Sequence, residues 1–315
     1  MLESKINPRN LGVEIEAVVG YLGLGGNSEI QQSLSELFRH NGLTSNSRGY
    51  SHAAVTTDVC VETDSSLNFE NCPFQGVRSA SLEVKTRILN DAADAERVLT
   101  KALDIMRFVG CRVNTTTGMH CHASIPEALS DPRIIKSLYN LIHKYQFVLY
   151  GLCPPSRLTS TYCKPLPAAS NPLRGCRTMR CFGRALAHLD RYYLVNFTHL
   201  WGDVPRVEFR LFASTLNATK CVNYVRLVCG LIDHACRRSV QAVAEPLPNN
   251  RKSLESMLVT CGFKVNTGIY SKVAPEMRET GRWLLARWFE FNGRQALKPK
   301  DGANSGTISF ARESA

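Results

Sequence analysis

Four short apolar stretches of the sequence each carry two polar residues that lie two positions apart. These pairs are Glu14/Glu16, Glu62/Asp64, His120/His122 and Glu208/Arg210. Because side chains alternate between the two faces of a β-strand, both members of a pair would point to the same side. Carboxylates that share a cleft repel one another, and a divalent cation can compensate their charge. Oxygen-rich ligand sets suit magnesium or manganese, and an imidazole ligand slightly favours manganese.

Each of these motifs also has an ordinary structural explanation. An E-x-E strand is more often a solvated sheet edge, and an H-x-H pair more often lies in a core or on a surface. The stretch "VEFR" (207–210) could hold a cross-strand ion pair. Glu83, in "SLEVKTRIL" (81–89), could simply pair with Lys85 or Arg87. The joint occurrence of the motifs, in this order along the chain, favours a metal site.

Strands and helices must bring these side chains together. Alternation with a period of two predicts strands over residues 11–19, 53–62, 78–89, 118–125 and 206–212. Helical spacing predicts helices over residues 27–43, 91–110, 131–150, 174–191, 219–243, 251–261 and 275–291, with Ser28 and Gln31 as a capping box in the first. Several strands are half polar, which is typical of an antiparallel sheet with one functional face. The sequence therefore predicts an α+β fold.

The composition limits the classes of partner and compartment. The chain has 315 residues and a formal net charge of +11, which favours anionic partners such as nucleotides, acidic peptides or nucleic acid. Charges interrupt the long apolar runs, so we expect no membrane span. The first ten residues lack the apolar stretch of a signal peptide, and the twelve cysteines include no C-x-x-C pair. We therefore expect reduced thiols and a cytoplasmic location.

The motifs also resemble a known family. "GMHCHASI" (118–125) looks like the metal- and ATP-binding strand of glutamine synthetases. The order E-x-E, D-S-x-L with a later Glu, G-x-H-x-H and E-x-R is similar to the amidoligase branch of the glutamine synthetase and γ-glutamylcysteine ligase superfamily. Residues 11–235 match that branch through "LGVEIE", "TDSSLN", "VEFRLF", "PPSRLTSTYCKPL" and "LDRYYLVN". The chain departs from the branch after Glu83, where the branch usually has Ser-Pro.

The resemblance implies a curved antiparallel sheet with helices packed on one face, like the catalytic domain of glutamine synthetase. It implies an ATP-dependent carboxylate–amine ligase that forms an amide or peptide bond through an acyl phosphate, with ATP and Mg²⁺ (or Mn²⁺) as cofactors. The substrates would be a small-molecule or peptide carboxylate and an amine acceptor. The catalytic domain would span residues 1–243, with C-terminal helices over 244–298 packed on it and a flexible tail over 299–315.

Metal ligands follow from the same resemblance. The metal that bridges the β- and γ-phosphates of ATP would be held by Glu14, His120 and Glu208. A second metal, near the substrate, would be held by Glu16 and Glu83, with Asp64 assisting. Glu83 would in addition be a catalytic residue, which makes its environment decisive for the hypothesis.

Phosphate-binding and catalytic residues are implied as well. His122 and Ser124 would contact the nucleotide phosphates, and Arg157, in the long Pro/Ser/Thr loop over 153–172, would also bind the nucleotide. Arg210 would face the transferring phosphoryl group, where its planar guanidinium offers contacts that lysine cannot copy. Arg191, at the end of the basic helix over 174–191, would be catalytic and capture an acidic substrate. Solvation of that helix face explains its charges equally well.

Two other function classes remain open from the residues alone. A zinc-dependent hydrolase could use His120 and His122, although such sites need further histidines and an aspartate in a fixed order that the sequence lacks. A basic nucleic-acid-binding protein is the second alternative. It has no recognition motif in its favour, and the basic residues are not interleaved with aromatics. The sequence therefore disfavours nucleic acid as a partner, and it leaves the oligomeric state open.

Overall fold

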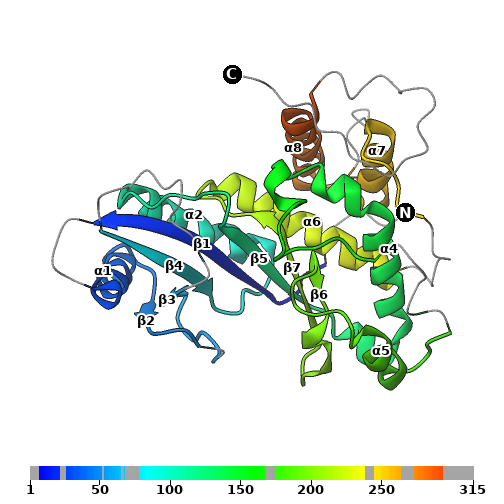
Figure 1. Ribbon diagram of the computed structural model, residues 1–315, viewed down its shortest axis with the longest axis horizontal. Helices are drawn as coiled ribbons and strands as arrows, with labels where there is room; N and C mark the ends of the chain where they lie inside the picture. Colours follow the sequence, from blue (N-terminus) through cyan, green and yellow to red (C-terminus); the bar gives the residue numbers. More distant parts are fainter. Residues whose placement is uncertain are drawn as a thin grey trace. The chain divides into compact units, whose positions relative to one another are not determined.

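The computed structural model describes residues 7–21, 26–51, 53–64, 67, 78–167, 173, 175–237, 245–263 and 273–293. Contacts along the chain divide it into two compact units (Figure 1). The sheet unit comprises Pro8–Ser124 and Arg206–Val225. The helical unit comprises Met1–Asn7, Ile125–Pro205 and Arg226–Ala315. Every strand that carries one of the four polar pairs belongs to the sheet unit.

The described residues of the sheet unit form six strands in the order β2-β3-β4-β1-β5-β7. Their bounds are Ser45–Ser47 (β2), Val59–Thr63 (β3), Arg78–Thr86 (β4), Leu11–Tyr21 (β1), Gly118–Ser124 (β5) and Arg206–Ala213 (β7). All neighbouring pairs are antiparallel except β2 and β3, which are parallel. Segments far apart in the sequence therefore become direct neighbours. Strand β1, which carries Glu14 and Glu16, lies between β4 and β5.

Alternation along β1 gives the sheet an apolar and a polar face. Leu11, Val13, Ile15 and Ala17 are at most 2% exposed, so one face of the strand is core. Helix α1 (Asn27–His40) packs against β2, β3 and β4, and it also contacts α2 (Ala92–Phe108) (Figure 1). Both helices bury apolar residues at helical spacing. The predicted α+β fold with a largely antiparallel sheet is confirmed.

The helical unit is built around α4 (Arg133–Tyr150), most of whose residues are buried. Its other elements are α3 (Glu127–Ser130), η1 (Pro155–Arg157), α5 (Met179–Leu186), β6 (Val195–Asn196), η2 (Thr198–Trp201), α7 (Arg251–Thr260) and α8 (Pro275–Asn292). Helix α6 (Ala218–Arg237) begins in the sheet unit and continues into this one. Tyr145 of α4 shares a hydrogen bond of 2.9 Å with Ser256 of α7, so the C-terminal segment joins the same core.

Several predicted element boundaries are wrong. The strand predicted over 53–62 begins only at Val59. The basic helix predicted over 174–191 is limited to Met179–Leu186. It can begin only after Gly175, whose φ of 83° is a left-handed value that a helix cannot contain. The capping box is not formed. Gly26 occupies the N-cap position, so Ser28 falls inside the first turn of α1.

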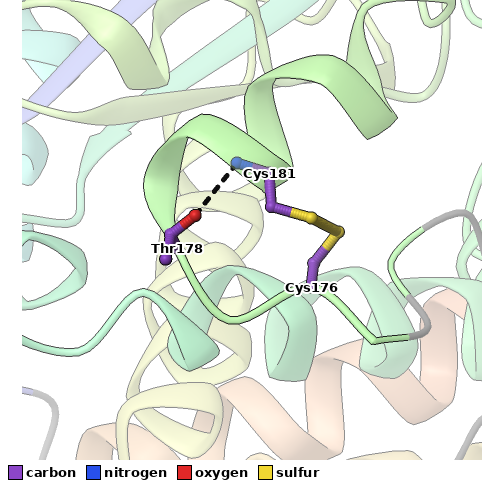
Figure 2. The surroundings of a disulfide bond; sticks show 3 residues. All are labelled: Cys176, Thr178 and Cys181. Atoms are coloured by element: carbon purple, nitrogen blue, oxygen red, sulfur yellow. Dashed lines mark hydrogen bonds between the residues drawn. A yellow bond between two sulfur atoms is a disulfide. The ribbon is translucent and has the colours of Figure 1, made fainter.

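Two cysteines of the helical unit form a disulfide, contrary to the expectation of reduced thiols. Cys176 and Cys181 are bonded across the start of α5 (Figure 2). The hydroxyl of Thr178, the N-cap residue, accepts a hydrogen bond from the backbone N–H of Cys181. Of the other nine cysteines in the described part of the chain, all but Cys236 are buried, as expected for small apolar side chains.

The predicted division into residues 1–243, 244–298 and 299–315 stays a prediction. The tail over 299–315 lies outside the described residues, as do residues 238–244 at the first predicted boundary. Among the helices that are described, none combines the length and the apolar character needed to cross a membrane.

Candidate active site

The register of the sheet places the polar pairs side by side on one face. Glu14 on β1 lies opposite His120 on β5 and Lys85 on β4. Glu16 lies opposite Glu83, and Glu83 in turn lies opposite Glu62 on β3. Residues from four strands thus form neighbouring rows, and the axes of adjacent strands lie about 4.8 Å apart. We call this surface of the sheet unit the site face.

One row is centred on His120, which is only 5% exposed. Its Nδ1 atom lies 3.1 Å from a carboxylate oxygen of Glu14 and 3.6 Å from one of Glu208. Its Nε2 atom lies 3.5 Å from an oxygen of Glu16. His122 follows on the same strand, and its Nε2 lies 3.3 Å from Glu14. Both predicted histidines therefore point at predicted carboxylates.

A bulge in β7 shapes the end of this row. Met119 pairs with Phe212 and Cys121 pairs with Phe209, so the single residue His120 lies opposite two residues of β7, Arg210 and Leu211. An extra residue in one strand bends it and changes the direction of its side chains. The guanidinium of Arg210 contacts the carboxylate of Glu208. The predicted E-x-R pair is therefore an ion pair that lies beside His120.

A second group of carboxylates lies nearer to β3. Glu16, Asp64 and Glu83 each offer an oxygen within 4.8 Å of the others. Glu14, Glu83 and His120 form another such group, so Glu83 belongs to both. Glu16 and Glu83 are 7% and 5% exposed, which is unusual for acidic side chains without a cation. The donor atoms and their spacing fit the oxygen-rich ligand set of a divalent metal.

The site face contains a cationic network that extends beyond the Glu83–Lys85 pair considered from the sequence. The ammonium of Lys85 lies 2.9 Å from Glu83 and 3.0 Å from Glu62. Glu62 is fully buried, and it also contacts Arg48 at 2.7 Å and accepts a hydrogen bond from the backbone N–H of Ser51. The pairing of Glu83 with Lys85 was the ordinary explanation for that carboxylate. The structure contains this ion pair as well as the cluster of carboxylates formed by Glu16, Asp64 and Glu83.

The charges on this face shift the pKa values of its members in opposite directions. Burial and the negative charge of Glu14 raise the pKa of Glu83 well above its ordinary value, although Lys85 opposes the shift and Glu16 adds to it. Burial also raises the pKa of Glu14, but the charges and hydrogen bonds of His122 and His120 outweigh it, so this pKa falls well below its ordinary value. These carboxylates are crowded closely enough to resist ionisation. A divalent cation bound between them would relieve their mutual repulsion.

The histidine next to this group responds to the same charges. Burial lowers the pKa of His122, but the carboxylates of Glu14 and Glu208 raise it more strongly, and the net change is upward. A cationic His122 would be suited to contact a phosphate oxygen. Ser124 ends the same strand and is buried, and its carbonyl accepts a hydrogen bond of 2.6 Å from Arg9. The predicted phosphate contacts of both residues stay predictions.

Two predicted site residues belong to the helical unit. Arg157 lies in η1 and is 3% exposed, and its carbonyl accepts a hydrogen bond from the thiol of Cys163. Arg191 is exposed. Its guanidinium lies over the ring of Tyr192, 5.0 Å from the centroid, and donates to the hydroxyl of that residue. The roles predicted for both arginines stay predictions.

The fold and the ligand set together define a sheet-borne acidic site of the kind expected for a metal-dependent enzyme. A family model described as "Putative amidoligase enzyme" matches residues 7–232. Because this match covers most of the chain, the protein belongs to that amidoligase family. The match includes every residue named on the site face. No curated protein matches the sequence.

One solved structure with a similar fold is the crystal structure of the complex between the prokaryotic ubiquitin-like protein Pup and its ligase PafA. The likeness has a TM-score of 0.41 and 8% sequence identity. It covers 89% of this chain but only 63% of that chain, so this chain spans less than two thirds of that one's length.

Proposed function

We propose that this protein is an ATP-dependent carboxylate–amine ligase that forms an amide or peptide bond through an acyl phosphate. The observation that carries the proposal is the convergence of Glu14, Glu83 and His120, whose donor atoms lie within 4.8 Å of one another on one sheet face. Membership of the amidoligase family supports the same reading. The substrates would be a small-molecule or peptide carboxylate and an amine, and the location would be cytoplasmic.

The chemistry explains why such a ligand set is needed. A carboxylate is a poor acyl donor because oxide is a poor leaving group. Transfer of the γ-phosphoryl group of ATP to a carboxylate oxygen yields ADP and an acyl phosphate. The amine then attacks the acyl carbon, and inorganic phosphate leaves with the bridging oxygen while the amine loses a proton. Bound Mg²⁺ or Mn²⁺ would neutralise the phosphate charge.

The proposed metal ligands divide into two sets. One divalent ion would be held by His120 and by Glu14 and Glu208, whose carboxylates lie 3.1 and 3.6 Å from the Nδ1 atom of His120, and it would neutralise phosphate charge of the nucleotide. The ion near the substrate would be held by Glu16, Glu83 and Asp64. The carboxylates are buried or half-buried and are therefore already held in place. Binding a metal ion would cost them little further side-chain entropy.

The other predicted site residues would bind and orient the substrates. His122 and Ser124 would contact phosphate oxygens from β5. Arg210 would contact the phosphoryl group in transfer, where a planar guanidinium stabilises charge as it spreads over several oxygens. Arg157 would bind the nucleotide, and Arg191 would capture the acidic substrate. Of these residues, Arg210 is fixed by its contact with Glu208.

Hydroxylamine can test the proposal before the natural amine is known, because it traps acyl phosphates as hydroxamates. The purified protein is incubated with ATP, Mg²⁺, hydroxylamine and pools of amino acids, short peptides or other carboxylates. We expect hydroxamate, ADP and phosphate to appear together with at least one pool, and to require the metal. The Glu14→Gln variant should lose this activity.

Glu36→Gln provides the matched control, because Glu36 is about half exposed on α1, outside the site face. This variant should match the wild type. Amide hydrolysis that depends on Zn²⁺ and needs no ATP would contradict the proposal and favour a hydrolase that uses His120 and His122.

A further inference from the structure

The disulfide between Cys176 and Cys181 closes a short loop at the start of α5 (Figure 2). The two cysteines lie 5 positions apart in the sequence. In the chain-entropy account, a disulfide stabilises a fold more as the loop that it closes becomes longer. A loop this short therefore gains less stability from the bond than a long loop would. Stabilisation of the helical unit is thus a weak explanation for the bond.

Helix α5 has other interactions that hold it in place. The hydroxyl of Thr178 accepts a hydrogen bond of 3.2 Å from the backbone N–H of Cys181, and its carbonyl accepts one of 3.0 Å from Phe182. The side chains of Phe182 and Leu186 are buried, so one face of the helix belongs to the core. Neither the cap nor the apolar face needs the disulfide. We therefore expect α5 to form when both thiols are reduced.

The surroundings of the pair favour thiol chemistry. Cys176 is buried but Cys181 is only half-buried, so a reagent in solution reaches Cys181 first. Arg177 and Arg180 are exposed, and each is the direct sequence neighbour of one of the cysteines. Arg184, also exposed, follows Cys181 by about one helical turn. Cationic side chains favour the thiolate, which is the reactive form, and they attract an anionic reagent such as glutathione.

Four other cysteines have the opposite surroundings. Cys60 and Cys111 are fully buried, and burial raises the pKa of these thiols to about 11 and about 12. Burial also raises the pKa of the thiols of Cys221 and Cys261. Such thiols stay protonated at neutral pH and react slowly. The pair at α5 therefore differs from these four in both exposure and charge.

We propose that Cys176 and Cys181 form a reversible thiol–disulfide site that responds to the ratio of reduced to oxidised glutathione. The Cys181 thiolate attacks a sulfur of glutathione disulfide and releases one glutathione. The Cys176 thiolate then attacks the Cys181 sulfur and releases the second. The two cysteines thereby lose two protons and two electrons, which glutathione disulfide accepts.

The new bond restrains the first turn of α5, where Arg180 lies, and reduction lets this turn open more often. The inference depends on the cytoplasmic location stated under the proposed function, where disulfides are mostly transient or redox-sensing. It does not depend on the ligase chemistry.

Glutathione buffers test the inference on the whole protein. The protein is equilibrated at a series of ratios of reduced to oxidised glutathione, starting from its reduced and from its oxidised form. Acid quenching, alkylation and peptide mass spectrometry give the oxidised fraction of each cysteine. We expect Cys176 and Cys181 to become oxidised together, with the same midpoint from both starting forms. Hydrogen exchange at the start of α5 should be at least about threefold faster in the reduced protein.

Cys181→Ser should abolish this joint transition. Cys236→Ser is the matched control, because Cys236 is a partly exposed cysteine elsewhere in the helical unit, and it should leave the transition unchanged. The double variant Cys176→Ser/Cys181→Ser should remain folded, as thermal melting shows.

Four results would each overturn the inference. They are a bond that survives excess reduced glutathione, a pair that stays reduced in oxidised glutathione, equal hydrogen exchange in the two forms, and a double variant that does not fold. Hydroxamate formation is measured separately. Failure of the proposed ligase activity would therefore leave the result of the glutathione titration unchanged.

Discussion

At the scale of single residues, the site depends on which charges surround each buried carboxylate. Glu14 faces two imidazoles, which lower its pKa and keep it available as an anionic ligand. Burial and the neighbouring carboxylates raise the pKa of Glu83 despite its contact with Lys85. Arg210 contacts Glu208 and is 14% exposed, so its guanidinium is partly open to a ligand. The same sheet face therefore offers both ligands for cations and a group for phosphate.

The role of Arg210 can be separated from its charge by the Arg210→Lys variant. Lysine keeps the positive charge, so nucleotide affinity should change little. Turnover should fall about 10²-fold or more, because lysine cannot make planar contacts to several phosphoryl oxygens in the transition state. The measurement is kcat for hydroxamate formation alongside the Kd of the nucleotide. Arg206→Lys, at the exposed start of the same strand, is the control.

Near-normal turnover in Arg210→Lys would mean that the arginine serves only as the ion-pair partner of Glu208. If weaker nucleotide binding accounts for the whole loss of turnover, Arg210 stabilises the bound nucleotide and not the transition state.

At the scale of elements, the register of β1 with β4 and β5 makes the site, and the end of β4 is fixed by a separate network. Arg87, just after β4, contacts Asp58 before β3 and both oxygens of Asp94 in the first turn of α2. Bidentate contacts of this kind are the strongest ion pairs that arginine makes. They connect the strands of the site to the helix that covers the apolar core.

Asp94→Asn should destabilise the protein in a pH-dependent way. The hydrogen bonds from Arg87 lower the pKa of Asp94 from its ordinary value of 3.8 to about 2. A lowered pKa means that the contribution is present above the unfolded value and is lost as the pH falls through the folded one. We expect the variant to lose about 1–2 kcal/mol at pH 7. The difference from the wild type should shrink between about pH 4 and pH 2.

Urea unfolding at several pH values measures this difference. Asp104→Asn is the control, because Asp104 is 56% exposed and its pair with Arg107 lies on the surface of α2. Its effect should be small at every pH. A constant loss for Asp94→Asn down to pH 2 would show that the carboxylate charge is not what stabilises this connection.

The sequence predicted the faces of the strands but not their neighbours. The alternation around Glu14 and His120 was sufficient to place each side chain on one face, because strand periodicity is local. The pairing of Glu83 with both Glu16 and Glu62 depends on which strands become adjacent, and that is set by long-range packing. Arg48 was missed for the same reason, since it follows the short strand β2 without any motif. Lys85, two residues after Glu83, was the one signal available for the cationic network.

At the scale of the whole molecule, the family match ends at residue 232, but the helical unit continues beyond it. Trp288 of α8 is fully buried, and its indole donates a hydrogen bond of 2.6 Å to Asn249. Asn292, at the end of the same helix, donates to the carbonyl of Gly151 directly after α4. Within the helical unit, the C-terminal helix is therefore part of the core around α4.

Trp288→Ala should accordingly cost about 3–5 kcal/mol of unfolding free energy, because it leaves a large cavity and removes one hydrogen-bond partner of Asn249. Chemical denaturation, or thermal melting if the variant is soluble, measures the loss. Trp201→Ala is the control, because Trp201 is 44% exposed, and its removal should cost much less. Equal effects of the two substitutions would show that α8 is not part of the stable core.

Isotope transfer tests the central claim most directly, once a carboxylate that supports hydroxamate formation is known. This carboxylate is labelled with ¹⁸O in both oxygens and incubated with the protein, ATP and Mg²⁺ in the presence of the amine. An acyl phosphate intermediate predicts that one ¹⁸O atom enters the released inorganic phosphate for each amide formed. Label that appears in AMP would instead indicate an acyl adenylate. Amide formation with no label in any phosphate product would contradict the proposed ligase mechanism.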